Sequence, residues 1–299
     1  MKIGLVSEIF GGMTYRDMLK KLQGIGIEEL EFCCAAWSKR TACGTGQISE
    51  KPEGSAGIQS RCNPMAPGDT GKKHHEGTIK TFQLAKILGI KKIVMMSGLP
   101  AGGPDDKFPN WVTTAWPPEC GQMLEYQWKT AAKYWKDLVK IASENGIEQI
   151  ALELHGFQLV YSCETFLKLR KSAGSMIGIN FDPSHFFWMG ADPLPAVSEL
   201  KEHIFHVHAK DTRINHAKAA LKTLLETESP SKPNARAWNY TTLGYGHDEY
   251  WWRRFILELR SAGYDGVLSI EHEDALMTPW EGVIKSVEFL KRSILTETL

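Results

Sequence analysis

The segment that decides the fold is QIALELHGFQLVYSCETFLKLRKSAGSMIGINFDPSHFFWMGADPLPAVSELKEHIFHVHAKD, residues 149–211. Short apolar runs alternate in it with helical patterns. The runs cover residues 149–154, 176–181 and 204–208, and the helical patterns cover 163–171 and 194–201. Continuous apolar runs of this length are typical of strands buried on both faces, as in a parallel sheet. The segment therefore predicts the strand–helix alternation of an α/β fold.

The same alternation extends to both ends of the chain. Further strands are expected at residues 3–9, 28–33, 58–63, 92–97 and 266–270. Further helices are expected at 14–22, 74–88, 119–144, 248–261 and 279–293. Together they make eight strands alternating with helices, which predicts a single (β/α)8 TIM barrel as one domain over residues 1–299.

A doubly wound open sheet is the alternative fold. That fold usually carries a glycine-rich phosphate loop, G-x-G-x-x-G, after its first strand. Here the first expected strand leads into SEIFGG, residues 7–12, which lacks this spacing. The barrel is therefore favoured. Its long loops are expected at 99–118 and 212–246, after strands four and seven, over the end of the barrel where active sites are built.

Composition excludes several classes of protein. The chain has 42% hydrophobic residues, enough for a packed core, and a formal net charge of +0. A dedicated nucleic-acid or anionic-membrane binder usually carries a basic excess. No apolar run approaches the roughly 18 residues needed to cross a bilayer. The start, Met1 to Leu5, does not resemble a cleaved leader, so we expect a cytoplasmic protein without membrane contact.

Acidic and histidine side chains fall at the ends of four successive expected strands. They are Glu153, Asp182, His208 and Glu271. Each alone is compatible with an ordinary loop acid or a hydrogen-bonded histidine. Charged groups at the ends of buried strands are costly unless they are paired or bind metal, and four at matching strand ends favour a metal site. We expect one divalent ion, Mn²⁺ first, and Mg²⁺, Co²⁺ and Zn²⁺ also suit these ligands.

These residues carry a family resemblance. The chain resembles the xylose-isomerase-like TIM-barrel superfamily, which includes sugar phosphate isomerases and epimerases, ketose 3-epimerases, inosose dehydratases and endonuclease IV. The residues that match are Glu153, the Asp182-x-x-His185 pair, His208 with Lys210-Asp211, and Glu271. The resemblance covers nearly the whole chain and is specific for the superfamily, but not for the substrate.

The resemblance implies a metal-dependent sugar isomerase or epimerase that removes a proton next to the carbonyl of a keto-sugar. In ketose 3-epimerases, the residues matching Glu153 and Glu271 bind the metal and exchange the proton on opposite faces of the substrate carbon. His185 resembles the family histidine that contacts substrate. Glu153 and Glu271 are therefore expected to be catalytic as well as metal ligands.

Three further residues are expected to contact the substrate: Lys210, Arg213 and Trp116. Arg213 is equally compatible with a surface salt bridge, and Trp116 with packing over the barrel mouth. His206 points to the same side of its strand as His208. His206 is either a histidine that hydrogen-bonds to a metal ligand or a buried core histidine whose hydrogen bonds are made within the barrel. The second interpretation is slightly preferred.

Some features depart from the plain epimerase pattern. His155 stands two residues after Glu153, on the same side of the strand, and a histidine there is a natural general base. The Glu153-x-His155 pair and the long segments after strands four and seven resemble the α subunit of C-glycoside deglycosidases. Those lyases expel an aglycone from a 3-oxo-glycoside by β-elimination, with a small β subunit as partner. Dehydration of a keto-inositol is a related alternative.

Two other functions remain as remote alternatives. Endonuclease IV-like DNA repair would need three zinc ions and a basic surface, so nucleic acid is not an expected partner. A non-catalytic carbohydrate-binding barrel would not need an exposed metal ion. The expected partners are a small-molecule sugar or 3-oxo-glycoside and, for a deglycosidase, the β subunit. We also expect an oligomer, with the helix over 119–144 as a candidate interface.

Overall fold

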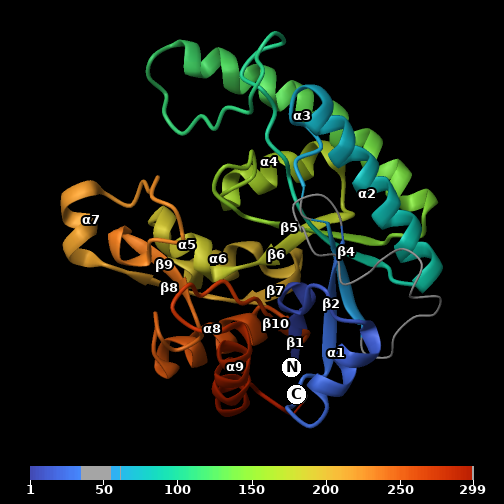
Figure 1. The fold of residues 1–299 in the computed structure, drawn as a ribbon. Helices are drawn as coiled ribbons and strands as arrows, with labels where there is room; N and C mark the ends of the chain where they lie inside the picture. Colours follow the sequence, from blue (N-terminus) through green and yellow to red (C-terminus); the bar gives the residue numbers. More distant parts are fainter. Residues whose placement is uncertain (35–54, 61, 298–299) are drawn as a thin grey trace.

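The computed structural model describes residues 1–34, 55–60 and 62–297. The barrel strands are β1 (Lys2–Val6), β2 (Glu29–Cys34), β3 (Ser55–Ser60), β4 (Lys92–Met96), β5 (Gln149–Glu153), β6 (Ile177–Phe181), β7 (Ile204–Ala209) and β10 (Val267–Ile270). They close into a parallel barrel in the order β1-β10-β7-β6-β5-β4-β3-β2 (Figure 1). The predicted TIM barrel is confirmed, and β5, β6, β7 and β10 are consecutive neighbours in it.

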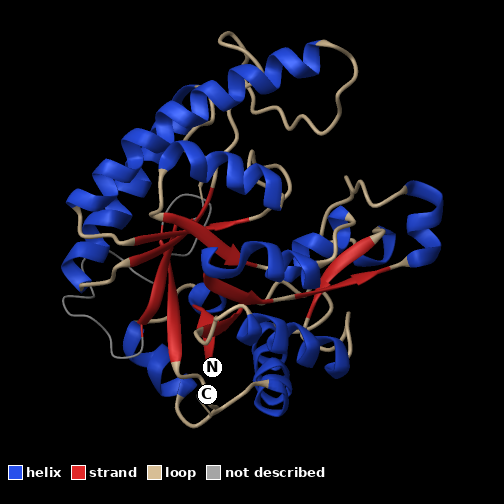
Figure 2. Cartoon of the chain, turned by 180° about the vertical axis from the view of Figure 1, so that it is seen from behind, coloured by secondary structure: helices blue, strands red, loops and turns tan. Residues whose placement is uncertain are grey.

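Helices follow the strands, and most of them cover the outside of the barrel (Figure 2). They are α1 (Tyr15–Leu22), α2 (Gly68–Leu88), α3 (Glu119–Glu144), α4 (Cys163–Ala173), α5 (Pro183–Met189), α6 (Pro193–Leu200), α7 (His216–Lys222), α8 (Glu249–Ser261) and α9 (Pro279–Ser293). Short 3-10 turns lie at Ser7–Phe10, Lys201–His203 and Pro233–Ala235. Among the described residues, no helix is both long and apolar enough to cross a bilayer.

Local signals place the helix ends. Thr14 is the N-cap of α1, and its side chain accepts a hydrogen bond from the Asp17 backbone N–H at 3.2 Å. Helix α2 begins at Gly68, six residues before the expected start at position 74, because its glycine-rich first turn hides the helical pattern. Gly71 is needed there, since a Cβ at this position would lie 1.8 Å from the carbonyl oxygen of Ala66.

The core fills the barrel and the layer between the barrel and its helices. Large side chains from the helices are fully buried against the strands, among them Phe82 on α2, Trp135 on α3, Phe166 on α4 and Trp252 on α8. Burying one such side chain contributes about 1.5–3 kcal/mol. The helices therefore hold the strand ends, and the side chains on them, in place.

The segment after β7 contains structure that the sequence did not predict. Strands β8 (Asp211–Ile214) and β9 (Trp238–Thr241) form an antiparallel hairpin, and α7 lies between them at one side of the barrel (Figure 1). Asp211 is fully buried and anchors the chain that follows the hairpin. Its carboxylate accepts hydrogen bonds from the backbone N–H groups of Gly244, Gly246 and His247 at 2.9–3.2 Å.

Candidate metal centre

The four predicted metal ligands meet at the carboxyl-terminal end of the barrel. Glu153 is the last residue of β5, Asp182 follows β6, His208 lies on β7 and Glu271 follows β10. One ligand atom from each lies within 4.8 Å of the others, and all four side chains are buried. His208 Nδ1 lies 3.2 Å from Glu153 Oε2, 3.5 Å from Glu271 Oε2 and 3.9 Å from Asp182 Oδ2. Adjacency of the four strands brings these side chains together.

Asp182 is oriented by the start of α5. It is the N-cap of that helix, and its Oδ1 accepts a hydrogen bond from the Ser184 N–H at 2.8 Å. Pro183 occupies the first helical position, where its missing N–H and fixed φ suit a helix start. With Oδ1 engaged by the helix, Oδ2 is the oxygen that faces His208.

Glu31 on β2 contacts His208 on the side of the ring opposite to the other carboxylates. This residue was not predicted from the sequence. Its carboxylate crosses the barrel interior, 2.8 Å from His206 Nε2 and 3.1 Å from His208 Nε2. Burial disfavours its charge, but His208 and His206 outweigh burial and lower the pKa of Glu31. Because Nε2 contacts Glu31, Nδ1 is the ring nitrogen of His208 that faces the other carboxylates. His206 is a hydrogen-bonded interior histidine that shares this carboxylate.

The charges of the centre are strongly coupled. Burial favours neutral forms of Glu153 and His208, but their hydrogen bonds and mutual charges prevail. The pKa of Glu153 is held well below its ordinary value by His185 and His208. The pKa of His208 is raised to about 9, chiefly by Glu31 and Glu153. The centre therefore keeps its carboxylates ionised, as metal ligands must be, and a metal ion would displace one proton from His208.

His155 lies beside Glu153 in the form that a general base requires. Burial and the charge of His185 lower the pKa of His155 to about 4, so its imidazole is neutral at pH 7. Its Nδ1 donates a hydrogen bond to the carbonyl oxygen of Gly156. The lone pair therefore resides on Nε2. Glycine is needed at position 156, because a Cβ there would lie 2.1 Å from the indole of Trp188.

His185 joins the metal ligands to an aromatic cluster. Its Nε2 lies 2.9 Å from Glu153 Oε1 and 3.3 Å from Asp182 Oδ2. Its Nδ1 lies 2.9 Å from the hydroxyl of Tyr240 on β9. The Trp188 ring stacks on Trp238 at a centroid distance of 4.7 Å. Tyr240 and Trp188 were not identified from the sequence, because their positions depend on the hairpin and on α5.

The structure separates the three residues that were expected to contact substrate. Lys210 is buried within the cluster, with Nζ 2.5 Å from Glu271 Oε2 and 3.0 Å from Asp182 Oδ2. Arg213 is exposed on β8, and Trp116 is 75% exposed in the segment before α3. Within the described part of the chain, neither makes a hydrogen bond or ion pair with a cluster residue.

This arrangement fits a divalent ion. Three carboxylates and an imidazole converge on one point, and the fully buried His208 Nδ1 has an oxygen of Glu153, Asp182 and Glu271 within 3.9 Å. Oxygen-rich sites with one imidazole suit Mn²⁺, Mg²⁺ or Zn²⁺. The donor set therefore matches the predicted metal site in composition and proximity.

A family model described as xylose isomerase-like TIM barrel matches residues 52–293. The chain belongs to this family. It is 45% identical over 311 residues to the uncharacterized protein YfiH of Bacillus subtilis (strain 168), covering 98% of this chain and 99% of that protein. It is 27% identical over 172 residues to the inosose dehydratase of Bacillus thuringiensis (strain Al Hakam), covering 56% of this chain and 55% of the dehydratase.

Solved structures share the fold of this xylose isomerase-like barrel. A D-tagatose 3-epimerase-like protein matches with a TM-score of 0.62 at 20% identity, over 98% of this chain and 97% of its own. The IOLI protein, solved with a bound zinc atom, matches with a TM-score of 0.63 at 16% identity, over 99% of this chain and 100% of its own. At these identities the likeness concerns the fold alone.

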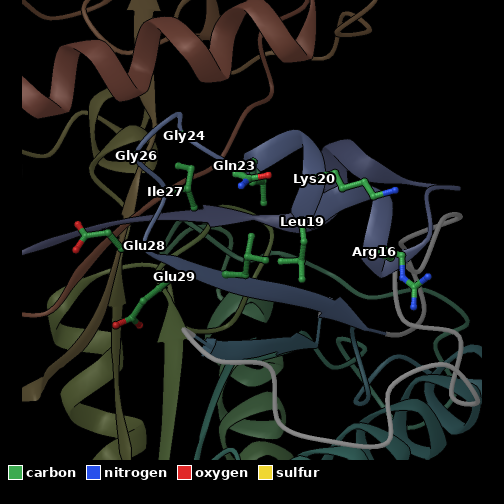
Figure 3. Close-up of a pocket in the computed structure, with 11 residues that line it drawn as sticks. Arg16, Leu19, Lys20, Gln23, Gly24, Gly26, Ile27, Glu28 and Glu29 are labelled. Atoms are coloured by element: carbon green, nitrogen blue, oxygen red, sulfur yellow. The ribbon is translucent and has the colours of Figure 1, made fainter.

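A surface cavity is lined by residues outside the candidate metal centre, and Figure 3 shows its lining residues. It has a volume of about 650 Å³ and lies between α1 and the start of β2, with Arg16, Lys20, Glu28 and Glu29 among its lining residues. It lies at the amino-terminal end of β2, whereas the ligand set lies at the carboxyl-terminal ends of β5, β6, β7 and β10. TIM-barrel enzymes build their active sites at the carboxyl-terminal ends of the strands, so we place the candidate site there.

Proposed function

We propose that this protein is a divalent-metal-dependent sugar isomerase or epimerase that removes a proton next to the carbonyl of a keto-sugar. The observation that carries the proposal is the set Glu153, Asp182, His208 and Glu271, whose ligand atoms lie within 4.8 Å of one another at the ends of adjacent strands. Membership of the xylose isomerase-like family supports it. Mn²⁺ is the proposed ion.

The ion would be held by these four residues, and when bound it would polarise the substrate carbonyl and acidify the neighbouring C–H. The chain's own groups then handle the proton. Glu153 and Glu271 project from separate strands and are proposed to exchange it on opposite faces of the substrate carbon. His155 Nε2 is an additional acceptor, because Nδ1 already donates to Gly156. His185 and Lys210 are proposed to bind substrate oxygens.

A lyase is the second candidate, and His155 is the feature that favours it. A neutral imidazole beside Glu153 suits β-elimination from a keto-inositol or a 3-oxo-glycoside. Its Nε2 can accept the proton while Nδ1 stays hydrogen-bonded to Gly156. The partial match to an inosose dehydratase supports the dehydratase version. The deglycosidase version would add a small β subunit as partner.

The first test separates these reactions. Mn²⁺-loaded protein is incubated in D₂O with free ketoses, with a keto-inositol and with 3-oxo-glycosides, and the products are followed by NMR. An isomerase or epimerase incorporates deuterium next to the carbonyl and yields a stereoisomer or a positional isomer. A lyase instead yields an unsaturated product or a released aglycone.

Glu271→Gln should lower the rate of C–H exchange by at least about 10²-fold, since it removes a ligand and a proton acceptor together. Exposed Glu148→Gln, which disturbs only the ion pair with Lys91, is the matched control. Activity that survives complete chelation, or that is unchanged in Glu271→Gln, would contradict the proposed function.

A further inference from the structure

Lys210 contacts the same carboxylate oxygens that face His208 Nδ1. Its Nζ lies 2.5 Å from Glu271 Oε2 and 3.0 Å from Asp182 Oδ2, the two oxygens that lie 3.5 Å and 3.9 Å from that ring nitrogen. The lysine is only 2% exposed, so water does not screen its charge. An ammonium and a divalent ion bound here would therefore draw on the same two oxygens.

Two cations that share buried oxygens weaken each other's binding. A hydrogen bond from an ammonium draws electron density from Asp182 Oδ2 and Glu271 Oε2, which makes each oxygen a weaker ligand for a metal ion. The two positive charges also repel across a medium of low dielectric constant. Coordination of the ion by these two oxygens is therefore stronger when Lys210 Nζ moves away from them.

A second set of contacts is ready to receive the ammonium. Nζ lies 3.3 Å from Glu273 Oε2, whose side chain is 35% exposed, and 4.6 Å from the centroid of the Tyr240 ring. Tyr240 lies on the hairpin and Glu273 is partly open to solvent, whereas Asp182 and Glu271 lie in the buried ligand set. A small movement of Nζ toward Glu273 and Tyr240 keeps its charge compensated and leaves it beside the ligand set.

We propose that Lys210 and the divalent ion compete for Asp182 and Glu271, so that Lys210 sets the metal affinity and its ammonium is released toward a substrate oxygen as the ion binds. This inference rests on the proposed function and deepens it. It assigns Lys210 two opposing effects: it weakens metal binding, and it places a second positive charge where the substrate oxygen gains negative charge during proton removal.

The test measures Mn²⁺ affinity in the full chain. After chelation, isothermal titration with Mn²⁺ alone is carried out on the wild type, Lys210→Met and Lys210→Arg. Lys210→Met should bind Mn²⁺ roughly tenfold to a hundredfold more tightly, the range in which groups behind metal ligands act. Lys210→Arg keeps the charge and should stay near the wild type. Lys222→Met, which removes a lysine paired with Glu226 far from the centre, is the control for loss of a lysine.

A second measurement separates competition from damage to the fold. At saturating Mn²⁺, Lys210→Met should exchange the substrate C–H about 10²-fold more slowly, although it holds the metal more tightly. If Lys210 only supports the structure, its replacement should lower both the Mn²⁺ affinity and the rate of C–H exchange. If Lys210→Met folds poorly when chelated, Mn²⁺ should raise its melting temperature by more than it raises that of the wild type.

The outcomes distinguish this inference from the proposed function. If neither the wild type nor any variant binds Mn²⁺, the proposed function fails. If all of them bind Mn²⁺ and Lys210→Met binds it no more tightly than the wild type, the proposed function stands and the competition is disproved.

Discussion

Carboxylates lie at both ring nitrogens of His208, and the geometry of the site depends on this residue. Nδ1 faces Glu153, Asp182 and Glu271, while Nε2 lies 3.1 Å from Glu31 Oε2. An acceptor behind a ligating histidine fixes the tautomer and the ring orientation and makes the free nitrogen a better ligand. Glu31 is therefore a positioning residue, although it does not belong to the four-ligand set.

Glu31→Gln should weaken Mn²⁺ binding roughly tenfold to a hundredfold. The amide has nearly the shape of the carboxylate, but it cannot accept hydrogen bonds from both histidines as strongly. Isothermal titration measures the dissociation constant, and Glu29→Gln, on the same strand and paired with Lys2, is the matched control. An unchanged affinity in Glu31→Gln would show that His208 is oriented by packing alone.

Helix α2 is tied to two barrel loops by a neutral histidine. The Asn63 N–H donates to His74 Nδ1 at 3.0 Å, and the Asn63 side chain exchanges hydrogen bonds with the Leu99 backbone at 2.9 Å. Burial lowers the pKa of His74 from 6.5. A protonated ring could not accept the Asn63 hydrogen bond, so the link between helix and loops depends on pH.

The free energy of unfolding should therefore fall on acidification below pH 6.5. Because the pKa of His74 is lower in the folded state, the unfolded chain binds the proton first; the contribution is present above 6.5 and is lost as the pH drops toward the lower folded value. Urea titrations at pH 7.5 and 5.5 should show a smaller loss for His74→Asn, which keeps an acceptor but does not titrate. His216→Asn, exposed on α7, should behave like the wild type. Equal losses in all three proteins would refute the assignment.

Over the whole molecule, the candidate centre joins four neighbouring strands close to the place where the last barrel strand pairs with the first. Glu153 and Asp182 come from the middle of the sequence, whereas Glu271 follows β10, which pairs with β1 and closes the barrel. A ligand that binds the folded state alone stabilises it by mass action. An ion held by β5, β6, β7 and β10 would thus oppose opening of the barrel at this side.

Mn²⁺ at about 100 times its dissociation constant should stabilise the fold by about 2.7 kcal/mol, which raises the melting temperature by several degrees in a domain of this size. Differential scanning calorimetry with and without a chelator measures the shift. Asp182→Asn, which keeps an N-cap side chain for α5 but removes the ligand charge, should lose most of it. A full shift in that variant would locate the ion elsewhere.

The barrel and the meeting of the four candidate ligands were predictable because they depend on local rules. A buried parallel strand shows itself as a short apolar run, and in a closed barrel the carboxyl ends of all such strands face the same side. Glu153, Asp182, His208 and Glu271 each end one of these runs, so their positions along the chain already imply that they meet.

Glu31 and Tyr240 could be found only in the folded structure. Glu31 reaches His206 and His208 across 175 and 177 positions of sequence, by way of an interior that exists only once the barrel is closed. Tyr240 reaches His185 through a hairpin inside a segment that carried no strand signal. The sequence alone determined the strand order and the ligand types, because these follow from periodicity and chemistry. Tertiary structure decided which groups support the ligands, because contacts across a barrel depend on register and closure rather than on spacing along the chain.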